Sequence, residues 1–473
     1  MESKPYPQPP DCGNHTPFWR LTPHRLDTHR STPELPSECD ILIIGGGYSG
    51  ASVAYHILQG NETPPSTVLL EARQLCSGAT GRNEGGHLRP EMCSNVAKYI
   101  SRHGVEAAAE VVKYEVSHLR AIADVVEREK IDCDLTMTRS LDVYVDQEMV
   151  EKIRHGVEPL LSNSYQHGKY DFMKDAHFRF PTPGHPLNDE ELKETKVKGA
   201  KGFVSTPAAH MWPYKFICGL FEIALTKGLN LQTNTLVLEI SPQRDGEGYW
   251  KITTGNDRGV IRAKKVILAS NGYTSALAPE YAKAIVPCKG LCCHIVVAPS
   301  THQDEDTKPP PRLTNSYVTH VGSSPGEYLI PRADGSIIVG GAGSTFFPFL
   351  ELWHNNPDDG VLIDVANRYF DGYMQRTFVG WEKSGAYTKE VWTGVMGYSA
   401  DSLPHVGRVP MKENQFILAG FNGHGMPACF LAGKAIAQMA LDENITFEHT
   451  GLPRVYKTTV DRLEPKYNDT MPY

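Results

Sequence analysis

The pattern of hydrophobic and polar positions predicts a β-α-β unit near the start of the chain. Residues 40–44 (DILII) form a continuous apolar run that ends in three glycines, and residues 48–58 then carry apolar side chains at helical spacing. A second apolar run, STVLLEA, follows at 66–72. Short apolar runs bounded by glycine are typical of strands buried in a parallel sheet. The segment is therefore expected to fold as strand, glycine turn, helix and strand.

Later segments alternate between helical and strand-like patterns. Helical spacing covers about 91–160, where 104–130 is expected to form one long amphipathic helix or two, and it recurs at 213–226. The Asp-Gly pair in PRADGS predicts a hairpin over 328–341. Residues 415–441 repeat the opening order of strand, glycine-rich turn and helix.

The first 37 residues differ from the rest of the chain. They are rich in Pro, Thr and His and show no apolar period, so an extended arm is expected. Phe18, Trp19 and Leu21 are the residues that could hold this arm against the surface.

The glycine turn satisfies the pattern G-x-G-x-x-G with Gly45, Gly47 and Gly50. The first glycine allows a tight turn, the second lets backbone approach a pyrophosphate, and the third lets helix and strand pack closely. Glu71 lies 21 residues after Gly50, at the end of the second strand, where it can accept hydrogen bonds from ribose hydroxyls and would repel the extra phosphate of NADP. A purely structural bend explains the glycines, but not the strand, helix and acidic residue around them.

The loop after Glu71 separates FAD from NAD. Residues 76–90, CSGATGRNEGGHLRP, are mostly small and include Ser77, Thr80 and Arg82. Small residues let backbone lie close to a flat ligand, and hydroxyl and guanidinium groups can hold a pyrophosphate. The loop therefore favours FAD.

These motifs resemble the FAD fingerprint of the D-amino-acid oxidase and sarcosine oxidase superfamily. The likeness rests on the glycine turn, the acidic EAR segment at 71–73, SGATGRN, and three later segments: VILASNGY, YLIPRADGSIIVGGAG, and WTGVMGYSADSLPHVGRVP with FILAGFNGHGMPACFLAGKAIA. It spans about 40–441 and is weakest in the middle. The pattern TGRN…GG is most similar to the γ-glutamylputrescine oxidase-like branch.

The resemblance implies an α/β fold with a Rossmann-type FAD-binding domain and a discontinuous α+β substrate domain built on a mixed sheet. Residues 38–90, 201–285 and 391–473 would form the FAD-binding domain. Residues 91–200 and 286–390 would form the substrate domain, and 1–37 the arm.

The resemblance also implies which residues bind FAD. They are Gly45, Gly47, Tyr48, Ser49, Gly50, Glu71, Ala72, Arg73, Ser77, Ala79, Thr80, Arg82, Asn83, Gly85, Gly86, Val237, Asn271, Gly272, Gly420, Asn422, Gly423, His424, Gly425 and Met426. The family's flavin-bonding Cys and His positions are not matched, so non-covalent FAD is expected, with Cys76 as the one residue that leaves a covalent bond open. The turn at 420–426 would aim backbone amides and a helix N-terminus at the flavin, which favours its reduced form.

The chemistry implied by the resemblance is hydride transfer from a C–H beside nitrogen to flavin N5. The imine then hydrolyses, and dioxygen or another acceptor reoxidises the flavin. Such a site needs a dry aromatic pocket and an anchor for the rest of the substrate. The candidate catalytic residues are His87, Arg89, Trp212, Tyr328, Trp392, Tyr398 and His424. Each has a structural alternative: an ion pair for Arg89, and core packing for the histidines and aromatic residues.

Two departures from the family leave the type of enzyme open. The lysine that sarcosine-type members use to activate oxygen has no counterpart in SIIVGG, although Lys289 on a neighbouring strand could substitute, and Glu84 interrupts the usual GRNGG. One alternative is therefore a dehydrogenase of a 2-hydroxy acid or of a secondary-metabolite intermediate. Another is a non-catalytic flavoprotein scaffold whose arm binds a partner.

Composition narrows the cellular context. The chain has 473 residues, enough for two domains, and a net charge of −8 that argues against a nucleic-acid partner. No segment approaches the roughly 18 apolar residues of a membrane helix, and no secretory signal is recognisable, so a cytoplasmic location is expected. The ten cysteines show no zinc spacing, so free thiols and no metal are expected. The expected partners are a small amine or amino-acid substrate and dioxygen or another electron acceptor.

Overall fold

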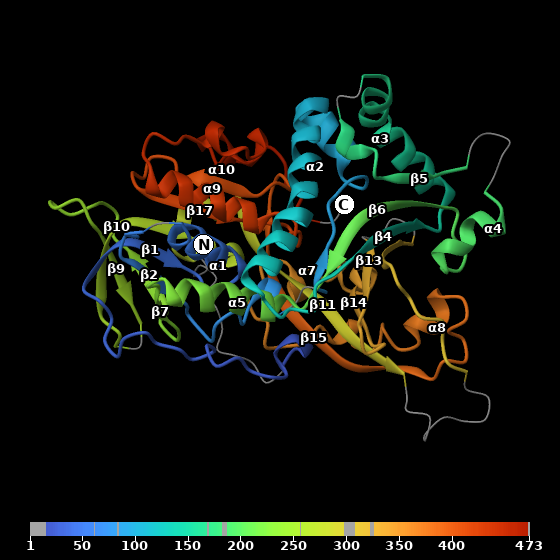
Figure 1. Cartoon of the computed structure of the whole chain (residues 1–473), viewed down its shortest axis with the longest axis horizontal. Coiled ribbons are helices and arrows are strands. Elements are labelled where there is room, and N and C mark those ends of the chain that lie inside the picture. The colour runs from blue at the N-terminus through green and yellow to red at the C-terminus, as the bar shows by residue number, and fades with distance from the viewer. Residues whose placement is uncertain are drawn as a thin grey trace.

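Two large sheets organise the fold, which we describe on a computed structural model of the chain. It describes residues 16–60, 62–82, 85–167, 170–181, 187–255, 257–297, 308–321 and 326–471. The sheets lie beside one another, with the chain crossing between them several times (Figure 1).

The first sheet has eight strands and contains the predicted β-α-β unit. In spatial order its main path is β16 (His405–Arg408), β17 (Gln415–Ala419), β10 (Val260–Leu268), β1 (Glu38–Ile44), β2 (Thr67–Leu70) and β7 (Asn230–Gln232). Off this path, β9 (Trp250–Thr254) pairs with β10, and β8 (Val237–Ile240) pairs with β9. β1 is parallel to both β10 and β2, and its residues Leu42 and Ile43 are fully buried. The continuous apolar run is thus covered on both faces.

Three helices pack together on this sheet. α1 (Tyr48–Leu58) begins directly after the glycine turn and contacts both α5 (Pro213–Thr226) and α9 (Cys429–Leu441). A methyl group on Gly433 of α9 would lie within 3 Å of Ser52 of α1, so glycine is required for the two helices to approach this closely. α9 follows β17 and a glycine-rich turn, which confirms the second strand-turn-helix unit expected from the pattern.

The second sheet is mixed and has nine strands. Its spatial order is β15 (Ala386–Ser399), β11 (Ile285–Val297), β14 (Ile337–Gly341), β13 (Glu327–Pro331), β12 (Ser316–His320), β4 (Thr136–Tyr144), β6 (Gly202–His210) and β3 (His87–Leu88), with β5 (His177–Arg179) paired to β6. β13 and β14 form the predicted hairpin. The mixed α/β class expected from the resemblance is therefore confirmed.

The hydrogen bonding places three segments differently from the sequence analysis. β3, β6 and the whole of β15 pair in the second sheet, whereas 87–88, 202–210 and 391–399 had been grouped with the FAD-binding domain. Each segment lies at a crossing between the sheets, where the sequence pattern carries no information about which sheet a strand joins.

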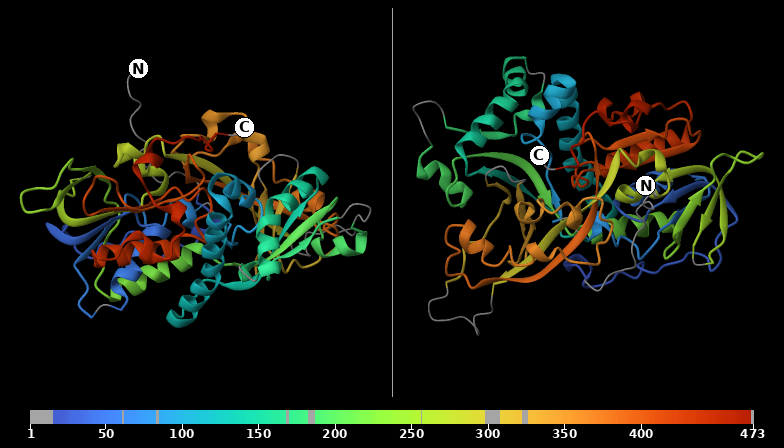
Figure 2. Two further views of the ribbon diagram at one scale, coloured as in Figure 1. Left: turned by 90° about the horizontal axis from the view of Figure 1, so that it is seen from above. Right: turned by 180° about the vertical axis from the view of Figure 1, so that it is seen from behind.

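Helices cover the second sheet and separate it from the first. α2 (Val96–Glu129) stands between the two halves of the molecule, and α3 (Gln147–His167) packs against it (Figures 1 and 2). Gly104 interrupts α2 with φ 84° and ψ 166°, so the segment is two helices joined by a kink. The remaining helices are short: α4 (Asp189–Leu192), α6 (Gly343–Phe346), α7 (Leu350–Trp353), α8 (Tyr373–Thr377) and α10 (Val460–Leu463). In the described part of the chain no helix is both long and apolar enough to span a membrane.

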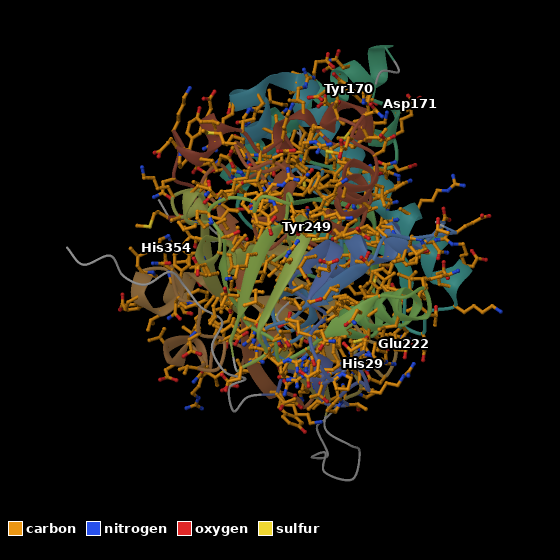
Figure 3. The ribbon with its side chains drawn as sticks, turned by 90° about the vertical axis from the view of Figure 1, so that its left-hand side faces the viewer. His29, Tyr170, Asp171, Glu222, Tyr249 and His354 are labelled. Carbon is orange, nitrogen blue, oxygen red and sulfur yellow. The ribbon has the colours of Figure 1, made fainter. Side chains whose placement is uncertain are left out.

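The described part of the N-terminal arm is packed onto the protein. Phe18 and Trp19 are buried in the main core, whereas Leu21 is 49% exposed. The Trp212 indole N–H donates to the Trp19 carbonyl at 2.7 Å. The arm runs on beside α5, where Arg25 pairs with Glu222 at 2.8 Å. Figure 3 labels Glu222 of α5 and His29 of the arm on the same side of the molecule. The arm therefore contributes to the core over these residues.

We expect Trp19→Ala to lower the free energy of unfolding by about 3–5 kcal/mol, because a fully buried indole is replaced by a cavity. Urea denaturation measures the change. Leu21→Ala, two residues away and exposed, should change it by less than about 0.5 kcal/mol. Equal effects of the two substitutions would contradict the packing described for the arm.

Candidate active site

A cavity opens along the edge of the first sheet where its parallel strands end. Its empty space, including the part open to solvent, is about 1110 Å³. Its wall includes the residues that directly follow β1, β2 and β10, and Phe421, two residues after β17. The carboxyl ends of parallel strands in a doubly wound sheet are where nucleotide ligands bind. The position of the cavity is therefore the one expected for a dinucleotide.

The glycine turn gives this cavity an open floor. Gly45 has φ +115°, and a side chain there would overlap the backbone of Ala269. A methyl group on Gly50 would overlap the carbonyl oxygen of Gly45, so this glycine lets α1 pack against β1. Gly47 differs from both, because a methyl group there would meet nothing within 4 Å and would point into open space. The second glycine thus leaves room for a ligand at the N-terminus of α1.

Polar groups near the glycine turn can hydrogen-bond to a dinucleotide. Ser77 Oγ is buried on the cavity wall and has no hydrogen-bond partner among the described residues, so a ligand oxygen could satisfy it. The Glu71 carboxylate accepts hydrogen bonds from the backbone N–H groups of Gly46 at 2.7 Å and Arg73 at 2.8 Å, which fixes its orientation on the wall. Its remaining lone pairs can accept ribose hydroxyls. These residues fit FAD.

The closing turn after β17 forms the far end of the cavity. Asn271 Oδ1 accepts the backbone N–H of Gly420 at 2.9 Å, and Asn422 Oδ1 accepts the N–H of Ser399 at 2.7 Å. These two amides hold the turn against β10 and β15, while Gly423 and Gly425 line the cavity. Asn271 is on the wall as well, but Asn422 acts by bracing the turn.

Comparison with known proteins agrees with this geometry. The family described as FAD dependent oxidoreductase (DAO) matches residues 40–439. The chain belongs to this family. It is 23% identical to the gamma-glutamylputrescine oxidoreductase of Escherichia coli (strain K12) over 403 residues, which cover 85% of this chain and 83% of that protein.

Solved structures of FAD-dependent oxidoreductases share the fold. Glycine oxidase from Geobacillus kaustophilus superposes with a TM-score of 0.63 at 17% identity, covering 89% of this chain and 99% of that chain. The L-alpha-glycerophosphate oxidase of Mycoplasma pneumoniae, whose structure has FAD bound, gives a TM-score of 0.60 at 18% identity over 90% and 100% of the two chains. The family match over residues 40–439 confirms the expected FAD dependence of this oxidoreductase.

The structure divides the predicted FAD-binding residues of this oxidoreductase into two groups. Those on the cavity wall are Gly45, Gly47, Tyr48, Ser49, Glu71, Ala72, Arg73, Ser77, Ala79, Thr80, Val237, Asn271, Gly272, Gly423 and Gly425. Those outside the wall are Gly50, Arg82, Gly85, Gly86, Gly420, Asn422, His424 and Met426. Asn83 lies outside the described residues, as does Glu84.

Several residues outside the wall have structural contacts instead. The Arg82 guanidinium donates to the carbonyls of Thr393 and Asp359, each at 2.8 Å, which ties the loop after Glu71 to the second sheet. Gly85 leaves room for the ring of Tyr328, and Gly86, with φ +71°, leaves room for the carbonyl of Met211. Met426 is buried in the core.

Sequence reasoning missed part of the wall. The additional lining residues include Gly78, Thr235, Leu236, Ser270, Tyr273, Ala276, Leu277, Val395, Met396, Phe421 and Cys429, together with Cys76, which had been considered only for a covalent bond. Thr235 and Leu236 directly precede the predicted Val237, and Ser270 directly precedes Asn271. Extending each predicted contact to its neighbours at the strand ends would have found these three. Burial raises the pKa of the Cys76 thiol above its usual range.

One face of the second sheet packs against the core that contains α1, α5 and α9, and it carries the candidate catalytic residues Trp392 and Tyr328. Trp392, Cys292, Gly340 and Tyr328 lie opposite one another on β15, β11, β14 and β13. Because Gly340 has no side chain, the ring of Tyr328 can cross it and bring its hydroxyl within 2.9 Å of Cys292 Sγ. The Trp392 indole N–H donates to the Arg82 carbonyl at 2.6 Å. Trp392 and Tyr328 thus connect this face to the loop after Glu71.

Two further candidates, Tyr398 and His424, lie close to the exposed Gly423. A methyl group on Gly423 would be 3.3 Å from the Tyr398 hydroxyl and 3.1 Å from Met396 Sδ. Met396 itself lines the cavity. Tyr398 and Met396 are therefore the side chains of β15 that the closing turn approaches.

Arg89 is engaged in an ion pair. Its Nε and Nη2 donate to the two oxygens of Asp142 at 3.0 and 2.8 Å, and Glu91 lies 3.6 Å from its Nη1. Arg89 and Asp142 are both buried. The structure shows for Arg89 the ion pair that the sequence left open as an alternative.

His424 pairs with a residue that no sequence pattern identified. Its Nε2 lies 2.8 Å from Glu115 Oε2 of α2, and the same oxygen accepts the backbone N–H of Glu91 at 2.7 Å. Burial lowers the pKa of His424, but the charge of Glu115 and its hydrogen bond outweigh this, so the pKa is raised above the ordinary 6.5. The imidazolium form is favoured beside the cavity.

His87 and His210, unlike His424, have lowered pKa values. They face each other on β3 and β6, and within the described chain neither His87 Nε2 nor His210 Nδ1 has a hydrogen-bond partner. Burial, reinforced by the charge of Arg89, lowers the pKa of His87 well below 6.5, and burial lowers that of His210 to about 4. Both rings are therefore neutral at neutral pH, with ring nitrogens available for hydrogen bonding.

We expect Glu115→Gln to move the pKa of His424 from above 6.5 to below it, because the lowering effect of burial remains and the raising partner is lost. In the wild type the protonated pair stabilises the fold fully below pH 6.5, and this contribution is lost as the pH rises through the raised pKa. An NMR titration of the histidine ring protons measures the shift. Glu110→Gln, on the same helix but paired with Arg454, should leave His424 unchanged.

Proposed function

We propose that this FAD-dependent oxidoreductase oxidises a C–N bond of a small amine or amino acid. The observation that carries the proposal is the position of the aromatic face of the second sheet, where Tyr328, Trp392 and Tyr398 adjoin the loop after Glu71 and the closing turn that bound the FAD cavity. The named relatives, which include a gamma-glutamylputrescine oxidoreductase and a glycine oxidase, support the same class of substrate.

Bound FAD supplies the two-electron acceptor for this chemistry. The substrate loses a hydride from the carbon beside nitrogen and a proton from the nitrogen, and the resulting imine takes up water to give a carbonyl compound and an amine or ammonia. The protein has to bind the free amine, orient its C–H bond and exclude water. The neutral His87 is suited to accept a hydrogen bond from the amine, and the aromatic rings form the dry wall.

The cofactor is proposed to be held without a covalent bond. Cys76 is the residue for which the sequence analysis leaves a covalent bond open. Burial raises the pKa of its thiol, so the thiol stays protonated. A protonated thiol is a poor nucleophile. Denaturation in acid should therefore release all of the flavin into the supernatant.

Dioxygen is proposed as the acceptor that regenerates the cofactor. Lys289, the substitute considered for the family's oxygen-activating lysine, is buried and donates to the carbonyl of Val361 at 2.8 Å. Burial lowers its pKa below the ordinary value. Measuring hydrogen peroxide release beside reduction of an artificial dye, with the same substrate, separates an oxidase from a dehydrogenase. We expect peroxide in amounts equal to the product; dye reduction without peroxide would identify a dehydrogenase.

A further inference from the structure

We propose, on the basis of the proposed function, that the substrate of this site is an amine that carries no carboxylate beside its reactive carbon. The inference narrows the substrate from amines and amino acids to amines alone. It rests on how the basic and acidic side chains around the substrate side are already paired.

Among the described residues, Arg89 and Arg332 on this side each form an ion pair. Arg89 forms ion pairs with Asp142 and Glu91. Arg332, at the end of β13, pairs with Asp134 at 3.0 Å and lies over the ring of Trp212 at 4.8 Å. Binding a carboxylate through the Arg89 guanidinium would require breaking an existing ion pair, at a cost that offsets the new contact. Arg332 Nε is buried without a partner among the described residues, but the guanidinium lies 5.6, 5.4 and 4.8 Å from the ring centres of Phe18, Trp19 and Trp212, so a carboxylate would have to displace this aromatic packing.

Three other cations are held by the loop at 357–361. Arg73 makes a bidentate pair with Asp359 at 2.8 and 3.0 Å, and Lys289 donates to the carbonyl of Val361. Arg82 donates to carbonyl groups of the same loop and of β15. These contacts fix the three side chains away from a substrate carboxylate.

The histidines offer no substitute cation. His87 and His210 are neutral, and so is a third histidine on this side, His294 of β11. Burial lowers the pKa of His294 to about 4. Their unpartnered nitrogens can hydrogen-bond to an amine but provide no positive charge. His424 is the cationic exception, and its charge already faces Glu115 at 2.8 Å.

The charges that meet beside His424 leave an excess of negative charge. Three carboxylates, those of Glu91, Glu115 and Asp142, are linked through hydrogen bonds and ion pairs to two cations, Arg89 and protonated His424. One negative charge is left over in a buried setting, where Coulomb interactions are weakly screened. Such a cluster attracts an ammonium group and repels a carboxylate.

The test compares matched pairs of substrates that differ only in the carboxylate. The FAD-loaded protein is mixed without oxygen with phenethylamine or phenylalanine, and with putrescine or ornithine, using both enantiomers of each amino acid. We expect the amine of at least one pair to reduce the flavin about tenfold faster than its amino acid or more. An amino acid that reduces the flavin as fast as its amine would overturn the inference while leaving C–N oxidation intact. If no member of either pair reduces the flavin, and no other amine or amino acid does so, the proposed function is overturned instead.

A substitution in the protein tests the same inference through the preference for amine over amino acid. Asp142→Asn removes one carboxylate and releases Arg89, so the preference for amine over amino acid should shift toward the amino acid by about tenfold. Asp469→Asn, which breaks the comparable bidentate pair with Arg102 remote from the cavity, should leave the preference unchanged. If Asp142→Asn does not fold, titrating the wild type with benzoate decides: a flavin spectrum that does not change supports the inference, and saturable binding contradicts it.

Discussion

Gly47→Ala should weaken FAD binding while leaving the stability of the apoprotein unchanged. A methyl group at this position meets no protein atom within 4 Å and points into the cavity at the N-terminus of α1. Overpacking of this kind costs about 1–3 kcal/mol, which corresponds to a loss of FAD affinity of roughly 5- to 150-fold. Fluorescence titration of the apoprotein with FAD measures the affinity, and urea denaturation the stability.

Two other glycines serve as controls for this prediction. Gly246→Ala also adds a methyl group in open space, but away from the cavity, so neither quantity should change. Gly50→Ala should lower both, because its methyl group would overlap the carbonyl oxygen of Gly45. If Gly47→Ala bound FAD as tightly as the wild type, the pyrophosphate could not lie at this turn.

Asp359→Asn should destabilise the protein by about 3–5 kcal/mol, because it leaves Arg73 buried without its charged partner. Asp359 is fully buried in the loop that crosses from the second sheet to the FAD cavity, and Arg73 lines that cavity. Weakening this charge-assisted contact, by about 1.5 kcal/mol or more, should also lower FAD affinity about tenfold. The urea midpoint and the FAD titration report the two effects.

Asp364→Asn provides the matched control. This aspartate is exposed a few residues further along the chain and accepts a hydrogen bond from Asn367 Nδ2 at 3.1 Å. Its substitution should change the free energy of unfolding by less than about 0.5 kcal/mol. Equal effects at Asp359 and Asp364 would show that the contact with Arg73 does not join the two halves of the molecule.

The FAD end of the site could be predicted because its determinants are local. The glycine turn, the strand before it and Glu71 lie within 32 residues of sequence, and each constrains the backbone in a way that a pattern records. The Asp-Gly hairpin was predictable for the same reason. These are the elements for which expectation and structure agree.

The substrate end could not be predicted because its determinants are distant in sequence. Glu115 and His424 are 309 residues apart, and no periodicity links them. The pairing of Arg89 with Asp142 depends on β3 crossing to the second sheet. The sequence pattern does not predict this crossing either. β6 was missed because Ser205, Thr206 and Pro207 interrupt its apolar alternation, although pairing with β4 buries it.

Anaerobic reduction of the bound flavin is the most direct measurement of the central claim, that this FAD-dependent oxidoreductase oxidises C–N bonds. Purified FAD-loaded protein is mixed without oxygen with a panel of amines and amino acids, and with a matched panel of 2-hydroxy acids, while the yellow absorption band is followed. We predict that at least one amine bleaches the band, that its carbonyl product appears in equal amount, and that air restores the colour. Bleaching by a 2-hydroxy acid alone, or by dithionite but by no amine or amino acid, would contradict the account.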